Sequence, residues 1–553
     1  MKRLVLLAAV AGALVLPASA WAHAALLRTS PQASATVNTP PDHVALTYSE
    51  AVEPRFAIVS VTDAAGRSVT AGEPTRSLQD ADELDIPLHR VPEGWYLVFW
   101  RVISADGHPV RGVFTFAVGP NPGPAPAFTV PSLSEPAATP SLVALRWAVF
   151  FFAMAAIGLL ALRCGIARPL LRDRPRALAV AFWVALGVAL VVNVVYVFDA
   201  TAEFALRPVT DVGALLPLLQ KSAFGRGWLT LELLLVLLGV AGGIALWLDR
   251  GARRRRSVAE LVSLLGAALA AAAVLLVPGA AGHAAQTSPR ALSIALDWLH
   301  LVAGSLWVGG LIGLLLLRRN VAALVVTVPR FSNVAFASVV VLLGTGVGAS
   351  VVHLPTLSSL WDTSYGTAIL VKAGLLLAAM ALAAVNLLRT RPALLRPVPP
   401  ASAAILLRRL VACETVLVAA AIAAAAVLSS LPPPPKALAS LGTVSAHTGP
   451  GAVVRAFDDG GYHVVLHVSP NRAAMPNAFA VQLSRNGNPV HGAAVTLRFT
   501  MLDMEMPAQE YTLPETRPGT YARTIPALVM VGRWGLQISV GSFTTTVVDK
   551  AGG

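Results

Sequence analysis

The chain has 553 residues, of which 56% are hydrophobic and only 13% charged. A soluble protein has about 25% charged residues, so the composition excludes a wholly soluble protein and indicates an integral membrane protein with soluble parts. The formal net charge is +13, but much of the basic excess lies in short loops between apolar runs, where it orients helices in a membrane. The sequence has no basic groove interleaved with aromatic residues, so we expect no nucleic-acid partner.

The two cysteines, Cys164 and Cys413, lie in or beside apolar runs. The soluble parts therefore have neither a disulfide nor a thiolate metal site. Any metal bound there must use His, Asp, Glu, Met or backbone nitrogen.

The amino terminus has the pattern of a secretory signal peptide. Lys2 and Arg3 precede the apolar run Leu4 to Leu16, and Ala20-Trp21-Ala22 follows. We expect cleavage after residue 22. His23 would then be the first residue, and its free amine and imidazole can together chelate Cu(II).

Residues 23–120 alternate like short strands separated by Pro, Gly, Asp and Asn, which predicts a β-sandwich of the cupredoxin-like or Ig-like kind. Asp106 and His108 lie on a turn between two of the expected strands. Together with His23 they would supply three nitrogens and one oxygen to a metal ion. By itself, the Asp-x-His pair also fits a turn aspartate beside a surface histidine.

This first domain resembles the periplasmic copper carrier family CopC. The resemblance rests on His23-Ala24-Ala25-Leu26, on the strand Leu46 to Glu53 and on Trp100 to Pro109. It implies a Cu(II) site formed by His23, Asp106 and His108, with Glu50 nearby. Residues 23–130 contain no methionine, so the Met-rich Cu(I) site of some relatives is missing, and we expect this domain to hold Cu(II) only.

A Pro- and Ala-rich linker, 121–140, leads to an expected eight-helix transmembrane bundle over residues 141–431. The eight apolar runs lie near 142–163, 177–198, 228–248, 258–280, 291–317, 332–353, 366–388 and 404–430. Alternate loops between the runs are rich in arginine. The positive-inside rule makes these loops cytoplasmic and predicts both chain ends on the periplasmic or extracellular side of the cytoplasmic (inner) membrane.

This topology brings three histidines to one end of the bundle: His283, His300 and His353. His300 would lie about 13 Å below the outer surface at the rise of an ideal helix. Asp297, His300, Gly304 and Trp307 share one helix face. We expect the three imidazoles to receive metal from the domain outside. The alternative is that an interior histidine only forms a hydrogen bond between helices.

The bundle resembles the CopD membrane family. The matching segments are Asp297-Trp298-Leu299-His300, Trp307-Val308-Gly309-Gly310, Phe331-Ser332, Thr345-Gly346, Thr363 to Gly366 and Lys372. The resemblance implies movement of copper across the inner membrane. The roles of several intramembrane residues stay open at this point: Asp297, Glu232, Glu414, Lys372, Cys164 and Cys413.

After a second linker, 432–445, residues 446–553 alternate like half-buried strands and predict a small second β-sandwich outside the membrane. The cluster of Met501, Met504 and Met506 resembles the YtkA-like domain. Thioethers select Cu(I), so Met504 and Met506 are candidate ligands for the reduced ion. Methionines on alternate strand positions can equally pack the core.

The leading hypothesis is that the protein transports copper across the inner membrane, for copper import, homeostasis or resistance. We do not expect it to be an enzyme. The expected partners are copper ions, the lipid bilayer and periplasmic copper chaperones. The expected ions are Cu(II) at the N-terminal site and Cu(I) in the membrane or C-terminal domain. The sequence has no G-x-x-x-x-G-K-[ST] loop, which argues against ATP-driven pumping. The rivals are a membrane electron-transfer protein with haem b on two of the core histidines, an oxidase that uses the N-terminal copper site, and a module that only sequesters copper.

Overall fold

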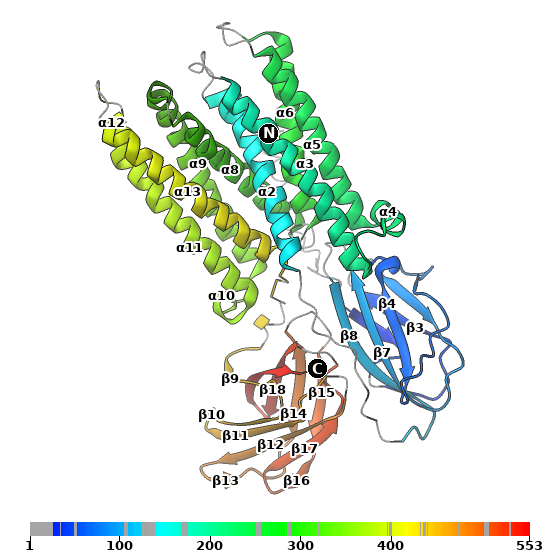
Figure 1. The fold of residues 1–553 in the computed structure, drawn as a ribbon. Coiled ribbons are helices and arrows are strands. Elements are labelled where there is room, and N and C mark those ends of the chain that lie inside the picture. Colours follow the sequence, from blue (N-terminus) through cyan, green and yellow to red (C-terminus); the bar gives the residue numbers. More distant parts are fainter. Residues whose placement is uncertain are drawn as a thin grey trace, which may run out of the picture. The chain divides into compact units, whose positions relative to one another are not determined.

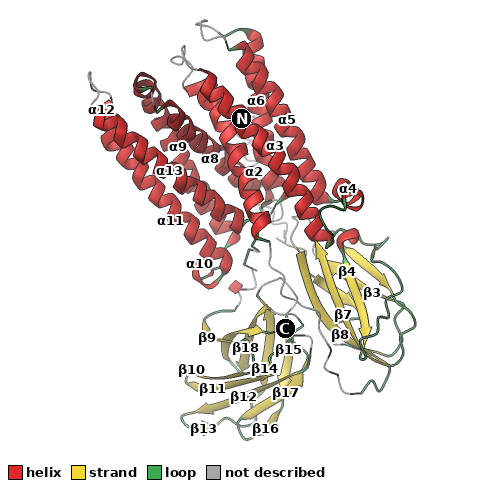
Figure 2. Ribbon diagram, viewed as in Figure 1, coloured by secondary structure: helices red, strands yellow, loops and turns green. Residues whose placement is uncertain are grey.

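A computed structural model gives the fold of a helical bundle and of two β-sandwich domains, each described here by itself (Figures 1 and 2). The residues that the structure describes are 26–553 without 34, 49–51, 104–108, 124–125, 127, 129–138, 167–174, 250–255, 283, 285–286, 288, 319, 395, 397–400, 432, 435–437, 440, 474, 503–507, 530–531 and 553.

The N-terminal domain is a sandwich of two four-stranded sheets, as the sequence predicts. One sheet has the order β1 (Leu26–Ser30), β3 (His43–Tyr48), β6 (Glu83–Pro87), β5 (Thr75–Arg76). The other has the order β2 (Thr36–Val37), β8 (Pro109–Val118), β7 (Gly94–Ile103), β4 (Ile58–Asp63). Alternate residues of both sheets fill the core, where Tyr48 and Trp100 meet edge to face with ring centroids 5.7 Å apart.

Among the described residues, eight helices in the middle of the chain are long and apolar enough to cross a membrane, as the sequence predicts. They are α2 (Pro140–Ala161), α3 (Pro175–Ala205), α5 (Ala223–Leu248), α6 (Val258–Ala281), α8 (Arg290–Leu317), α9 (Val321–His353), α11 (Ser364–Val385) and α13 (Ala401–Leu428). A π-helical turn extends α2 over Leu162–Ile166 and another extends α11 over Asn386–Thr390. Shorter helices accompany them: α4 (Val212–Lys221), α10 (Ser359–Asp362) and α12 (Arg391–Leu394).

Helix α9 begins about eleven residues before the apolar run near 332 that predicted it. The helix starts at Val321, where the Asn320 side chain accepts a hydrogen bond from the Ala323 N–H, and it continues through Pro329. Arg330 falls between the apolar runs 291–317 and 332–353, which predict a loop there, but in the structure it lies inside α9. A proline inside a helix removes one backbone hydrogen bond and often ends the helix. Here the N-cap at Asn320 stabilises the first turns of α9, and the helix continues past Pro329.

Helix α8 lies inside the bundle and contacts α2, α6, α9 and α13. Its glycines permit this close packing. A Cβ atom on Gly309 would overlap the backbone of Gly158 and Leu159 in α2, and one on Gly310 would overlap the Phe331 ring of α9. The Trp307-Val308-Gly309-Gly310 segment is therefore a packing motif of small residues between membrane helices.

The C-terminal domain is a second sandwich, again as predicted. One sheet has the order β10 (Val453–Asp459), β11 (Tyr462–Ser469), β12 (Asn477–Arg485), β17 (Thr520–Ile525), β16 (Glu515–Arg517), with β13 (Asn488–Pro489) beside β12. The other has the order β15 (Gln509–Leu513), β14 (Val495–Met501), β18 (Gly532–Val540), β19 (Phe543–Ala551), β9 (Val444–Thr448). Met501 is buried opposite Trp534, so this methionine packs the core.

Candidate metal-handling site

Seven of the nine candidate ligands lie outside the described residues: His23, Glu50, Asp106, His108, His283, Met504 and Met506. For the Asp106–His108 pair, the structure gives only the two flanking strand ends, where Ile103 of β7 pairs with Pro109 of β8. For His283, it gives the end of α6 at Ala281. The two remaining candidates, His300 and His353, belong to adjacent helices of the bundle.

His300 projects from the first half of α8 toward α9. Its Nδ1 atom lies 2.9 Å from the hydroxyl oxygen of Thr345 on α9. An ideal Cβ on Gly346 would stand 3.8 Å from His300 Cε1, in ordinary contact with the ring. Thr345 thus provides a hydrogen-bonding partner for the imidazole, and Gly346 leaves room for it.

His353 is the last residue of α9, and both of its ring nitrogens have partners. Nδ1 lies 2.8 Å from the carbonyl oxygen of Ala349, one turn earlier in the same helix. Nε2 lies 3.3 Å from the hydroxyl of Thr287, just before α8 begins. The ring also stacks near Tyr365 of α11, with centroids 6.4 Å apart and planes 23° apart. His353 is therefore a well-anchored side chain at the end of the helix.

Charged residues lie around these two histidines. Asp297 of α8 faces α6, where its Oδ2 atom would be 2.8 Å from a Cβ on Gly279. Lys372 of α11 interacts electrostatically with both Asp297 and His300, and Tyr365 interacts with Asp297. We call this set the polar cluster: Asp297, His300, Thr345, His353, Tyr365 and Lys372. In a medium of low dielectric constant, such a gathering of ionisable groups is costly and indicates a functional role.

The sequence did not indicate which side chains the two histidines contact. In the sequence, Thr345 and Tyr365 belong to segments that resemble the CopD family, and Thr287 belongs to no motif. The one available signal is the adjacent pair Thr345 and Gly346, a hydroxyl that can bond to an imidazole beside a residue that leaves room for the ring. Among the described residues, no three His, Cys, Asp or Glu side chains are grouped to hold a metal ion.

The other intramembrane acids pair with amides of neighbouring helices. Glu232 of α5 accepts a hydrogen bond from Asn193 of α3 at 2.8 Å. Glu414 of α13 accepts one from Asn386, in the π-helical turn after α11. Such pairs link helices, because each satisfies the carboxyl group inside the bundle. Cys164 is buried, whereas Cys413 is exposed on the surface of α13.

Three family models match this chain. The CopC domain matches residues 26–119, Copper resistance protein D matches residues 325–428, and the YtkA-like model matches residues 458–539. The second match begins in α9 and ends in α13, so it does not include His300 on α8. It is narrower than the expected resemblance, which extends over nearly the whole bundle. The three matches follow one another in the order of the three structural parts.

Individual proteins are similar to longer or shorter parts of the chain. Copper transport protein CutJ of Bacillus subtilis is 29% identical over 387 residues, which is 68% of this chain and 70% of that protein. Protein YobA of Escherichia coli K12 is 37% identical over 113 residues, or 20% of this chain and 90% of that protein. The crystal structure of CopC from Methylosinus trichosporium OB3b is 31% identical, with a TM-score of 0.17, and covers 18% of this chain and 99% of that one.

The fold and the polar cluster define a multi-pass membrane protein. In the sequence, one β-sandwich domain precedes the membrane helices and another follows them. Within this class of protein, the chain combines a match to the CopC domain, a match to Copper resistance protein D and a YtkA-like match, and over 68% of its length it is similar to a copper transport protein. These similarities support copper handling by this multi-pass membrane protein.

Proposed function

We propose that this protein moves copper across the inner membrane, and that the polar cluster is where copper enters the helix bundle. The exported N-terminal domain captures Cu(II) with His23, Asp106 and His108, with Glu50 nearby. It passes the metal to His283, His300 and His353. Imidazole nitrogens are suitable ligands for copper, and a tethered donor domain removes the need for a diffusing carrier.

The observation that carries this proposal is the position of His300 and His353 on adjacent helices. Both lie toward the same end of the antiparallel pair α8 and α9, since His300 pairs with Thr345, two turns before His353. Lys372 and Tyr365 of α11 join them there. A metal ion that reached this end of the bundle would meet two imidazoles within the same group of helices.

The charges at the other end of the bundle support the proposed orientation. Arg163 forms an ion pair with Asp249, and Arg256 forms one with Glu260 at 3.3 Å. These residues lie at the end of α2, after α5 and at the start of α6. The arginine-rich loops at this end fit a cytoplasmic side, and in the proposed orientation the polar cluster and both β-sandwich domains are periplasmic.

Copper uptake into proteoliposomes tests the role of His300. Loss of a group that only orients a metal ligand typically costs about 10- to 100-fold in affinity, so we expect His300→Ala, which removes the ligand itself, to slow uptake by at least about tenfold at limiting copper. The control is His89→Ala, because His89 is an exposed histidine of the N-terminal sandwich. Equal uptake rates for wild type and His300→Ala would contradict the proposal.

The visible absorption spectrum of the same purified protein tests the rival function. A haem b protein would show a Soret band that disappears in His300→Ala. We expect no such band. A band that depends on His300 would replace the transport role of this residue by electron transfer.

A further inference from the structure

The hydroxyl of Thr345 has a fixed role in its hydrogen bond with His300. A hydroxyl has one hydrogen to donate and two lone pairs that accept. Thr345 Oγ1 lies 2.7 Å from the carbonyl oxygen of Val341 and 3.3 Å from that of Leu342, and a carbonyl can only accept. The single hydroxyl hydrogen is therefore directed at the helix's own backbone. Toward His300 the Thr345 oxygen is an acceptor, so the His300 Nδ1–H is the donor.

This assignment determines which nitrogen of His300 can bind a metal. A neutral imidazole carries one N–H, and its other nitrogen has the lone pair. With the hydrogen on Nδ1, the lone pair is on Nε2. The hydrogen bond to Thr345 also limits rotation of the ring, which lies against Gly346. Second partners of this kind fix the tautomer and orientation of metal-binding histidines.

His353 reaches the same tautomer by a different route. Its Nδ1–H donates to Ala349 O, and its Nε2 accepts from the Thr287 hydroxyl at 3.3 Å. A metal ion at His353 must therefore displace a hydrogen bond. Among the described residues, His300 Nε2 has no hydrogen-bond partner. A metal ion can therefore bind His300 without displacing a hydrogen bond, unlike at His353.

We propose that Thr345 is the positioning residue for His300: it holds Nδ1 protonated, so that Nε2 is the atom that binds the transported metal. The inference rests on the proposed function, because it gives that function's central ligand its coordinating atom. If the role of Thr345 were purely structural, its hydroxyl would need only the hydrogen bond to Val341 O and no contact with His300. Within the described part of the chain, the hydroxyl of Ser350 on the same helix makes only such a bond, to Gly346 O at 2.9 Å, and it provides a matched control.

The test uses the full-length protein in lipid, labelled with ¹⁵N in its histidine rings, and Ag(I) as a diamagnetic probe of metal binding by an imidazole nitrogen. The His300 resonances are those that disappear in His300→Gln. In the wild type, we expect a protonated Nδ1, a bare Nε2, and a shift of the Nε2 resonance when Ag(I) is added. Thr345→Val should give a mixture of tautomers and weaken Ag(I) binding by about 10- to 100-fold. Thr345→Ser should restore the wild-type spectrum, and Ser350→Ala should leave it unchanged.

The possible failures can be told apart. A proton on Nε2 in the wild type, or the same spectrum and Ag(I) affinity in Thr345→Val, would overturn the role of Thr345 while leaving His300 as a ligand. If Ag(I) leaves the Nε2 resonance of the wild type unmoved, His300 is not a ligand, and the proposed function loses its central residue together with this inference.

Discussion

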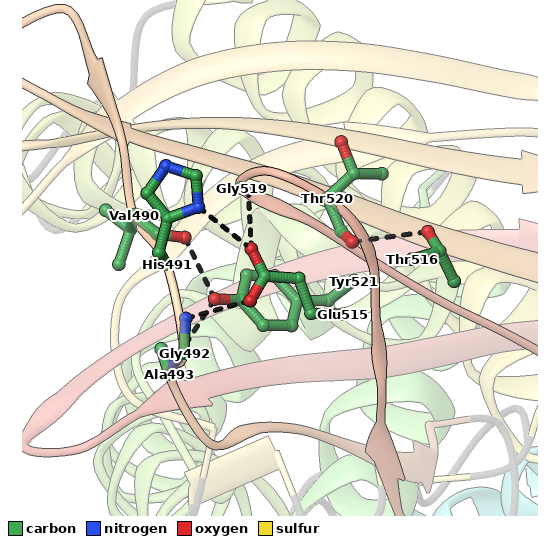
Figure 3. Close-up of polar contacts among 9 residues, drawn as sticks. All are labelled: Val490, His491, Gly492, Ala493, Glu515, Thr516, Gly519, Thr520 and Tyr521. Carbon is green, nitrogen blue, oxygen red and sulfur yellow. Dashed lines mark hydrogen bonds and ion pairs between the residues drawn. The ribbon is translucent and has the colours of Figure 1, made fainter.

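Single residues give this chain part of its pH dependence, and Glu515 in the C-terminal sandwich is the clearest case outside the membrane helices. Its carboxylate accepts hydrogen bonds from the backbone N–H groups of Gly492 and Gly519, both at 2.9 Å, and lies 3.2 Å from His491 Nδ1 (Figure 3). These donors, the Gly492 N–H first, lower the pKa of Glu515 below its usual value of 4.5. Charge-assisted bonds to backbone N–H groups favour the ionised form.

The sign of the resulting pH dependence follows from linkage. Because the pKa of Glu515 is lower in the folded state, its contribution to stability is fully present above the unfolded-state pKa and is lost as the pH falls through the folded-state value. We expect Glu515→Gln to lower the melting temperature of the segment 446–553 at neutral pH and to flatten its decrease below about pH 4.5. Thermal unfolding measured between pH 3 and 7 tests this.

The matched control for this measurement is Glu510→Gln, which changes an exposed glutamate on β15. This variant should follow the wild-type pH profile. A Glu515→Gln profile that is parallel to the wild type at every pH would show that the backbone contacts of Glu515 do not bias its ionisation.

At the scale of the element, α8 depends on glycine more than on any ionisable group. Gly309 and Gly158 bring the backbones of α8 and α2 into direct contact. Without a hydrophobic driving force between helices in lipid, such close backbone approach supplies the packing energy. The same helix carries Asp297 and His300 two to three turns away, so its seating against α2 also sets the position of the polar cluster.

We therefore expect Gly309→Ala to destabilise the bundle by about 1–3 kcal/mol, the usual cost of an extra methyl group in a tightly packed site. The methyl group would overlap the backbone of α2, which cannot move aside as a flexible side chain can. Gly187→Ala on α3 is the control, because a Cβ there meets no atom within 4 Å. Thermal unfolding in detergent, followed by tryptophan fluorescence, should show a lower melting temperature only for Gly309→Ala.

The sequence predicted elements far better than contacts. Long apolar runs identify spans because the bilayer requires about 20 apolar residues, and alternation identifies the strands of both sandwiches. The start of α9 was wrong because Pro329 and Arg330 resemble a loop. The bond between His300 and Thr345 joins residues 45 positions apart, and helical periodicity gives the face of each helix but not which faces meet. The site was therefore predicted as a list of residues without its hydrogen-bond partners.

At the scale of the whole molecule, the order of the three parts suggests why they form one chain. In the proposed function, the N-terminal domain captures copper, and the linker 121–140 keeps it near the bundle at an effective concentration of about millimolar. A free carrier would have to be present at that concentration to deliver copper equally often. The benefit exists only while free copper is too scarce to reach the bundle by itself.

This reasoning predicts a copper-dependent effect of removing the domain. A chain in which residues 23–120 are deleted, with the signal segment joined to residue 121, should transport copper more slowly than the wild type at limiting copper. At saturating copper the two rates should converge, because the bundle then loads directly and the polar cluster is intact. Uptake rates in proteoliposomes over a range of copper concentrations measure this, with the wild type as the reference at each concentration. A deletion that is equally slow at all concentrations would mean that the N-terminal domain takes part in the transport step itself and not only in capture.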